Sequence, residues 1–479
     1  MKRLMTLILF SLLLAACSFA PRYQRPPMPI PVEYKETKEW KKAKGYTPTA
    51  KGTRWWFMFN DPVLNELEEK VTCTNQNLKV AFSRFQNARA AAQVARSAYY
   101  PTLLGVGNAD RQQKSRNIAN PSTNNSFSDF LAGVDVSYEI DLWGRVRNSV
   151  AASESQLRAS TADLAATSLS MHAELAMDYF ALRGDEASQR VLDATVAAYE
   201  KGLYITRKRY DGGAAPIADV DQAITQLENA RTAATEMRLR RAQLEHAIAV
   251  LVGEIPANFK MPPAKTRMSL VSIAPELPSS LLERRPDIAA AEQRVQAANF
   301  EIGVACAAFY PQINFSSIAG VESQTLANLF DQPSLFWSLG PISGLALVKP
   351  LANLVLFDGG KLRGLLNSAK ASYHETVASY RQTVLTAFQE VEDNLVAIRR
   401  LDQENRSQTA ATAAAKRALV QAIDRYKGGL TNYLDVVVNE NTALQAELNS
   451  VDIRTRRQVA SVLLIKALGG GWSCQTDCT

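Results

Sequence analysis

Two segments of the chain alternate between apolar and polar residues with a period of two. In 128–142, every even position from Val134 to Leu142 is apolar, and the odd positions between them carry acids or serine. In 311–321, a similar alternation begins at Ile313. This period is typical of β-strands, whose successive side chains point to opposite faces. Each segment therefore predicts a strand with one apolar face and one polar face.

Two further segments are expected to complete one β-hairpin in each half of the chain. Residues 101–111 alternate poorly, and residues 337–357 are very apolar but interrupted by prolines, so their register stays open. Four strands suit either a soluble sheet over a core or part of a membrane barrel. In lipid their open edges need partner chains, because closed barrels have about eight strands or more. The acidic face favours three copies and twelve strands, since a larger barrel can hold water.

Long proline-free segments predict the rest of the fold. Residues 145–211 and 361–427 are equal in length and lack proline, so each is expected to form one very long helix. Each is followed by a glycine pair suited to the left-handed end of a helix. Second helices are expected over 216–252 and 432–468, which gives two long helical hairpins.

The two hairpins form an internal repeat. RYDGGAAPIADV at 209–220 returns as RYKGGLTNYLDV at 425–436, a spacing of 216 residues. Tyr100-Pro101 and Tyr310-Pro311 are only 210 residues apart. The six-residue difference between the two spacings falls among the strands, where insertions are tolerated. The expected division is a signal peptide (1–16), a lipidated tether (17–60), a first repeat of helix, β-hairpin, long helix and helix (61–253), a linker (254–274), a second repeat (275–469) and a tail (470–479).

The N-terminus carries an export signal. Lys2 and Arg3 precede an apolar run that is too short to span a bilayer and ends at Cys17. Small residues before this cysteine resemble a bacterial lipobox, which implies that Cys17 is acylated and that Ser18 suits sorting to the outer membrane. An ordinary signal peptide is the alternative. The proline-rich segment 21–31 is expected to be an extended tether.

Charge and histidine content argue against nucleic-acid binding and catalysis. The net charge is +7, and basic residues are scattered among acids. His172, His246 and His374 lie in helical patterns without a metalloprotease or nucleophile motif around them, and we expect them at the surface or an interface. We expect no catalytic residue, no metal and no cofactor apart from the lipid on Cys17.

The other cysteines have different expected environments. Cys73 and Cys306 lie in helical patterns and are expected to be buried. Cys474 and Cys478 could form a local disulfide in an oxidising compartment. A metal site is the weaker alternative for that pair, because no histidine lies nearby.

Several segments together resemble the outer membrane efflux protein family, in its OprM/NodT branch of TolC-like channels. The resemblance implies an α+β membrane protein in which long antiparallel helical coiled coils form a periplasmic barrel. Four strands per chain would contribute to a twelve-stranded β-barrel in a homotrimer. The implied role is the outer-membrane exit duct of a tripartite efflux pump, with a periplasmic adaptor and an inner-membrane resistance–nodulation–division transporter as partners. The matching segments are LAAC (14–17), WWFMFNDPVLNEL (55–67), YEIDLWGRVR (138–147), LLERRPDIAAAEQRVQAAN (281–299), AAFYPQI (307–313), FDGGKLR (357–363) and the two repeated turns.

The same resemblance implies a gate at the hairpin tips. The family's tyrosine of the second tip is present as Tyr426, and its acids beyond each tip as Asp219 and Asp435. Thr431 replaces an arginine and Val438 replaces a second acid, so an arginine lock and a double acidic ring are in doubt. Asp219 and Asp435 could also simply complement the helix dipole.

The glycine pairs Gly212/Gly213 and Gly428/Gly429 are the implied adaptor-docking tips, although a plain helix-hairpin turn explains them equally well. Two other functions stay open. One is a type I protein-secretion duct of the same fold, and the other is a periplasmic structural lipoprotein that forms no channel. The expected location is the outer membrane, with a lipid anchor and a large periplasmic part.

Overall fold

A computed structural model describes most of the chain, which divides into two compact units. The strand unit comprises the described parts of Met1–Pro27, Phe85–Ser160 and Ala290–Tyr380. The helical unit comprises the described parts of Met28–Arg84, Thr161–Ala289 and Arg381–Thr479. The described residues are 18–31, 33–37, 54–115, 117, 126–262, 284–339 and 352–472.

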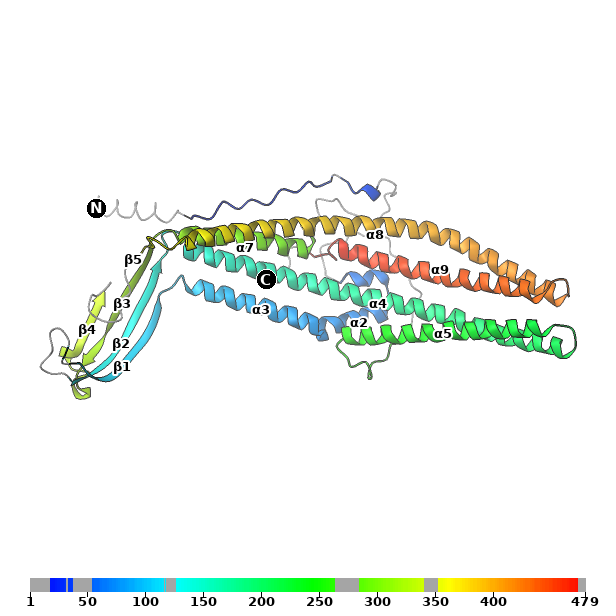
Figure 1. Ribbon diagram of the computed structural model, residues 1–479, viewed down its shortest axis with the longest axis horizontal. Coiled ribbons are helices and arrows are strands. Elements are labelled where there is room, and N and C mark those ends of the chain that lie inside the picture. The colour runs from blue at the N-terminus through cyan, green and yellow to red at the C-terminus, as the bar shows by residue number, and fades with distance from the viewer. Residues whose placement is uncertain are drawn as a thin grey trace. The chain divides into compact units, whose positions relative to one another are not determined.

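One antiparallel sheet lies in the strand unit (Figure 1). Its strands follow the order β1-β2-β3-β4, and β5 also pairs with β3. Because β2 occupies one edge of β3, β4 and β5 lie along the other edge. The predicted pairing of strands in each half is confirmed. Of the segment 337–357, whose register the sequence left open, residues 337–339 pair with β3 in β4 and residues 352–353 in β5, while residues 340–351 lie outside the described residues. The strands are β1 (Thr102–Gln113), β2 (Ser126–Ile140), β3 (Gln312–Ser323), β4 (Leu335–Leu339) and β5 (Ala352–Asn353).

The register collects apolar side chains on one face of this sheet. Val134 of β2 lies opposite Ala319 of β3, which lies opposite Trp337 of β4. Directly opposed residues share a face, and the next row on that face includes Val136 and Leu339. Trp337 is 74% exposed, so the apolar face is uncovered in the single chain. The alternation predicted for the two strands is confirmed.

The strand β2 is shorter than its sequence pattern. It ends at Ile140, whereas the alternation continues to Leu142. Asp141 instead caps the helix α4 (Arg145–Asp211), because its carboxylate accepts the N–H groups of Val146 at 3.1 Å and Arg147 at 2.9 Å. An acid that satisfies free N–H groups at a helix N-terminus stabilises the helix, which ends the strand two residues early.

Four long helices form the two predicted hairpins (Figure 1). The helices α4 and α8 (Lys361–Lys427) contain 67 residues each, as the proline-free segments predicted. The helices α5 (Ile217–Leu251) and α9 (Tyr433–Ala467) contain 35 residues each, within one residue of their predicted ends. We call α4 with α5 the first hairpin and α8 with α9 the second. None of the helices in the described ranges is both long enough and apolar enough to cross a membrane.

Shorter elements complete the two units. Buried aromatic residues of the one-turn helix η2 pack into the helical unit, where the ring of Phe59 lies 4.9 Å from that of Phe180 on α4. The segment around Trp55 is therefore part of a hydrophobic core. The shorter helices are η1 (Lys35–Thr37), η2 (Trp55–Phe59), α2 (Pro62–Thr74), α3 (Gln76–Ser97), α7 (Pro286–Ala307), η3 (Leu326–Asn328) and η4 (Gln332–Ser334).

The N-terminal arm is extended, as expected, and docks against the strand unit. The ring of Phe19 stacks on that of Tyr310 at 4.4 Å, and the Asn299 amide donates to the Pro21 carbonyl at 2.7 Å. A side chain at Gly303 would clash, because a Cβ there would lie 2.7 Å from that of Ala20. The arm is thus held by specific contacts over its first residues.

The burial predicted for two cysteines was wrong. Cys73 is exposed and Cys306 is only half-buried, although both are helical as expected. Cys73 follows the buried Val71 by two residues, which turns it about 200° around the helix and away from the core. The predicted signal peptide, Cys17, Cys474 and Cys478 lie outside the described residues.

Candidate functional site

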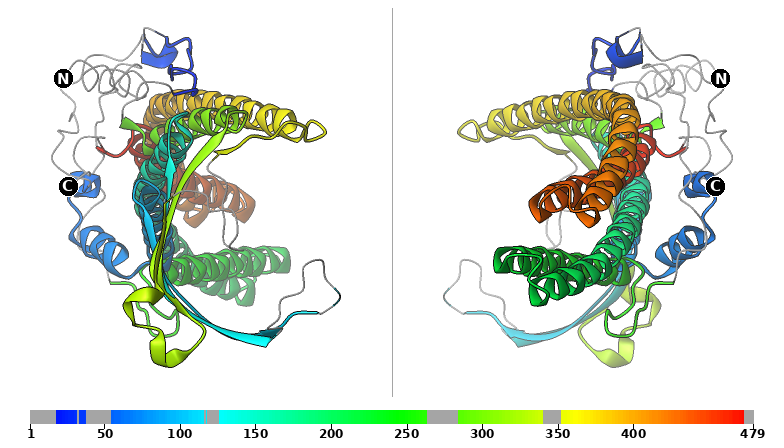
Figure 2. Two further views of the ribbon diagram at one scale, coloured as in Figure 1. Left: turned by 90° about the vertical axis from the view of Figure 1, so that its left-hand side faces the viewer. Right: turned by 90° about the vertical axis from the view of Figure 1, so that its right-hand side faces the viewer.

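Both hairpins turn at the predicted glycine pairs, onto which the right-hand view of Figure 2 looks. The second glycine of each pair, Gly213 or Gly429, has a positive φ, 73° and 72° respectively. L side chains rarely adopt this conformation. The first glycines, Gly212 and Gly428, would meet only ordinary van der Waals contacts if they carried a Cβ. The turn geometry therefore requires glycine at the second position of each tip.

Tyr426 lies in a hydrophobic cluster just behind the tips. Its side chain is 8% exposed, and its ring lies 5.4 Å from that of Tyr433. Both hairpins contribute, so the cluster holds the two tips together within one chain. This tip cluster consists of Ala223, Tyr426, Tyr433, Val436 and Val437, with Leu203 and Ile423 packed against it.

Arg209 of the first hairpin covers Tyr426 of the second. Its guanidinium carbon lies 4.4 Å from the ring centroid, and its Nη1 donates to the Tyr426 carbonyl at 3.3 Å. An arginine over an aromatic face is attracted to the ring's negative potential. Sequence reasoning missed this role, although the repeated Arg-Tyr pair was visible. The Tyr426 hydroxyl has no hydrogen-bond partner within the described part of the chain.

The two acids beyond the tips lie in different surroundings. Asp219, in the first turn of α5, is half-buried. Asp435, in the first turn of α9, is exposed and its carboxylate accepts the Thr431 hydroxyl. No hydrogen bond among the described residues joins either carboxylate to Tyr426. Thr431, which replaces the family's arginine, thus makes a bond within its own hairpin.

An acid that the sequence did not single out lies between the hairpins near the tips. Burial raises the pKa of Glu440 to about 7, and its Oε2 has no hydrogen-bond partner in the described ranges. Burial also raises the pKa of Tyr433 and Tyr199, and the charge of Glu440 adds to both shifts. Glu440 therefore titrates near neutral pH in a largely apolar setting, which its position in a helical pattern did not reveal.

Farther from the tips, a buried pair corrects the expectation for one histidine. His172 is 5% exposed, stacks on Trp56 at 4.5 Å, and places its Nδ1 2.6 Å from the Oε2 of Glu68. Burial lowers the pKa of His172 to about 4 and raises that of Glu68. Burial therefore favours the neutral form of each group, and a hydrogen bond joins the two side chains. Its partners come from distant segments, which is why the surface prediction for His172 was wrong. His246 and His374 are exposed.

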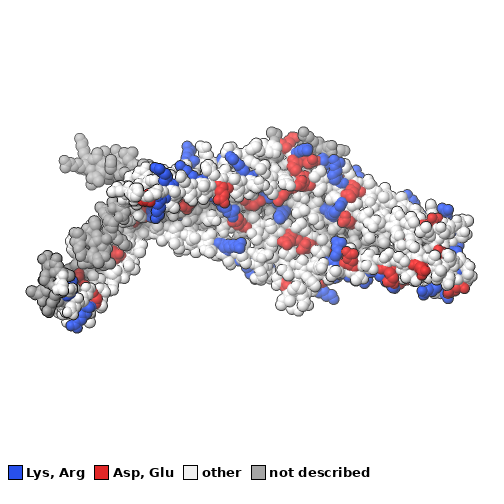
Figure 3. All heavy atoms as spheres, in the orientation of Figure 1, with Lys and Arg blue, Asp and Glu red and all other residues white. Residues whose placement is uncertain are grey.

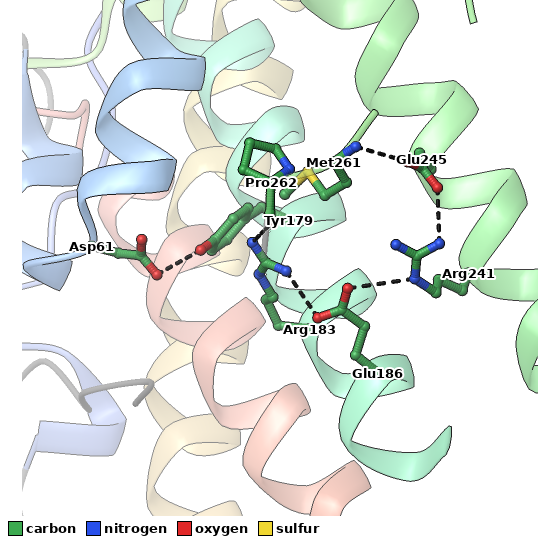
Figure 4. Close-up of polar contacts among 8 residues, drawn as sticks. All are labelled: Asp61, Tyr179, Arg183, Glu186, Arg241, Glu245, Met261 and Pro262. Atoms are coloured by element: carbon green, nitrogen blue, oxygen red, sulfur yellow. Dashed lines mark hydrogen bonds and ion pairs between the residues drawn. The ribbon is translucent and has the colours of Figure 1, made fainter. Parts of the chain in front are cut away.

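A polar network ties the first hairpin to the start of α2 (Figure 4). The Tyr179 hydroxyl donates to Asp61 at 2.6 Å, and Asp61 also caps α2 by accepting the N–H of Val63 at 2.9 Å. The guanidinium of Arg183 lies over the Tyr179 ring and donates to the Pro262 carbonyl at 2.7 Å. These contacts join α2, α4 and the segment after α5.

The same network continues to α5 through charged pairs (Figure 4). Glu186 accepts from Arg183 at 2.8 Å and from Arg241 at 3.4 Å. Arg241 also donates to Glu245 at 2.9 Å, and Glu245 accepts the Met261 N–H at 2.7 Å. Each carboxylate has a cationic or N–H partner, so the arrangement braces helices and leaves no free nucleophile or base.

The charged residues on the surface are of mixed sign. Lys and Arg side chains are interspersed with Asp and Glu over the face shown in Figure 3, with no large field of one sign. Within the described ranges, no group of three or more His, Cys, Asp or Glu residues is placed to hold a metal ion.

Two long helical hairpins, joined at their tips, together with an antiparallel sheet that exposes one apolar face, define an outer-membrane channel of the TolC type. The chain belongs to the outer membrane efflux protein family, whose model matches residues 67–254 and 277–470. This is a family of transport proteins. The match confirms the resemblance, the fold class, the outer-membrane location and the efflux role predicted from the sequence.

Individual relatives support the same assignment over nearly the whole chain. The toluene efflux pump outer membrane protein TtgC of Pseudomonas putida is 31% identical over 99% of this chain and 97% of its own length. Outer membrane protein OprJ of Pseudomonas aeruginosa is 31% identical over 97% and 95%. The structure of the outer-membrane channel OprN has a TM-score of 0.86 and 27% identity, and the alignment covers 95% of this chain and all of that one.

Proposed function

We propose that three copies of the chain form a passive, tip-gated exit duct that works with a periplasmic adaptor and an inner-membrane resistance–nodulation–division transporter. The open edges and the exposed apolar face of the sheet are the observations that support the trimer. In one chain, β1 and β4 each pair on one side only among the described strands, and the apolar face with Trp337 is exposed. Lipid does not tolerate open edges. Because β4 and β5 lie along the same edge of β3, each chain supplies four strand positions, and three copies supply the twelve strands of a barrel wide enough for water.

We propose that the gate lies at the tips of the hairpins. Tyr426 already links the two hairpins of one chain, and three copies of Asp219 and Asp435 would approach a common axis in a trimer. Like charges there repel or hold cations unless hydrogen bonds offset them. Gly212, Gly213, Gly428 and Gly429 would be the rim that meets the adaptor. A lipid on Cys17 and the domain division given above, with repeats at 61–253 and 275–469, complete the proposal.

Planar-bilayer recordings test the gate. The double variant Asp219→Ala with Tyr426→Phe is expected to raise single-channel conductance, and unchanged conductance would count against the gate. Tyr426→Phe alone is the informative control. Because the hydroxyl has no hydrogen-bond partner among the described residues, the ring packing should survive in this variant, and an effect would report a hydrogen bond that the described part of the chain does not supply.

The trimer is tested separately from the gate. A detergent-extracted protein that runs as a heat-resistant trimer and conducts ions supports the duct. A water-soluble monomer after Cys17→Ala would instead indicate a periplasmic structural lipoprotein. Crosslinking at the tips followed by identification of the co-purified inner-membrane protein separates an efflux transporter from a type I secretion system.

A further inference from the structure

The internal repeat gives every residue near one tip a counterpart 216 residues away near the other. Within one chain the contact between tips runs in one direction, because Arg209 of the first hairpin covers Tyr426 of the second. The counterparts of this pair are Arg425 and Tyr210. Here the arginine lies on the second hairpin and the tyrosine on the first. The chain therefore has the residues for a second contact of the same kind.

The counterparts of the covered residues are uncovered in the single chain. Tyr426 is 8% exposed, whereas Tyr210 is 43% exposed. Tyr433 is 5% exposed, whereas its counterpart Ile217 is 51% exposed. An aromatic and an aliphatic side chain thus lie open on the first hairpin where the second hairpin has a packed core. This part of the first hairpin lacks the neighbour that its counterpart has.

The residues that cover Tyr426 and Tyr433 also have counterparts on the second hairpin. Leu203, which packs against the tip cluster, has Leu419 as its counterpart. Arg425 is exposed, and no ion pair involves it within the described ranges, while Arg209 is half-buried over its tyrosine. Ala223 differs, because its counterpart is Asn439. The second hairpin therefore carries the leucine and the arginine of the covering surface.

We propose that in the assembled protein the second hairpin of one subunit covers the first hairpin of the next, with Arg425 over the next subunit's Tyr210 beside Ile217. The proposal rests on the homotrimer of the proposed function. Head-to-tail contacts of this kind close into a ring when the rotation fits. Contacts within and between subunits would then alternate around the tips, each made of an arginine from one hairpin and a tyrosine from the next.

Site-directed crosslinking tests the contact directly. The pair Arg425→Cys with Tyr210→Cys is treated in membranes with a short bismaleimide, since two backbones joined through an arginine and a tyrosine are too far apart for a disulfide. Covalent dimers and trimers are expected on gels run under conditions that separate the uncrosslinked trimer into single chains. The matched control is Arg209→Cys with Tyr426→Cys, which should link within one chain and leave the apparent mass unchanged. Four native thiols are first replaced by serine, and Cys17 is retained for acylation: Cys73, Cys306, Cys474 and Cys478.

The outcomes separate this inference from the proposed function. If the protein is trimeric and the control pair links within its chain, but the test pair gives only monomers, the contact is overturned and the duct stands. If the protein is monomeric, the proposed function fails first. If the protein with the test pair of cysteines does not assemble, a second measurement still tests the contact. It compares the conductance of Arg425→Ala, Tyr210→Ala and the double variant. Each single variant should raise open probability about two- to fivefold, the equivalent of an exposed cation–π contact of about 0.5–1 kcal/mol. The double variant should add little more, and fully additive effects would overturn the proposal.

Discussion

If the hairpin tips form the proposed gate, removing the guanidinium of Arg209 should loosen its closed state. Arg209→Ala deletes two interactions with Tyr426. The first is the cation–π contact at 4.4 Å, which we set at about 1 kcal/mol for a half-buried arginine, between the values for exposed and desolvated pairs. The second is the hydrogen bond to the carbonyl at 3.3 Å, which is long, so about 1 kcal/mol is taken for it as well. The closed state should lose about 2 kcal/mol per subunit, which shifts the equilibrium between closed and open tips roughly thirtyfold for each subunit.

Planar-bilayer conductance measures that shift. Arg209→Ala should raise the open probability strongly, and Arg209→Lys should do so in part, because lysine keeps the charge but not the planar stacking. Arg207→Ala is the matched control, since Arg207 is exposed in the same turn. If Arg207→Ala and Arg209→Ala give equal conductance, the loss of positive charge explains the effect and the contact with Tyr426 does not hold the gate.

Three further predictions concern other parts of the chain. Glu440→Gln should leave stability unchanged near pH 4.5 and raise it by about 1–3 kcal/mol at pH 8. The unfolded glutamate ionises above its ordinary pKa, whereas burial raises the pKa of the folded one to about 7, so the folded state loses stability as pH rises to that value. Thermal unfolding at both pH values checks this, and a gain at low pH contradicts it. Gly303→Val should displace Ala20 and cost about 1–3 kcal/mol, whereas Gly364→Ala, with open space around it, should not destabilise; rapid proteolysis of the arm in both variants would refute the clash. Intact-mass spectrometry of the mature protein should find acyl chains on Cys17, and an unmodified thiol there would rule out the lipobox.

The long helices could be predicted almost to the residue because their signals are local. The absence of proline over 145–211 and 361–427 and the glycine pairs that follow act on the backbone itself. The alternation in β2 and β3 likewise depends on one strand and its two faces. These features need no knowledge of which distant segments meet.

What the sequence did not reveal depends on contacts between distant segments. His172 is buried because Glu68 and Trp56 meet it from an earlier part of the chain. The role of Arg209 depends on a residue 217 positions away. The register of β4 was hidden because its apolar residues do not alternate, and the partner strand β3 decides it.

The edge strands β1 and β4, which pair on one side only among the described strands, predict how mutant alleles behave beside the intact gene. If the outer edges of β1 and β4 form hydrogen bonds only with other subunits, a subunit damaged in one of these strands can still join an assembly through the other strand. Every ring that contains it is left with a gap. Alleles of this kind are expected to be dominant when expressed beside the intact gene, while alleles that prevent folding altogether are expected to be recessive.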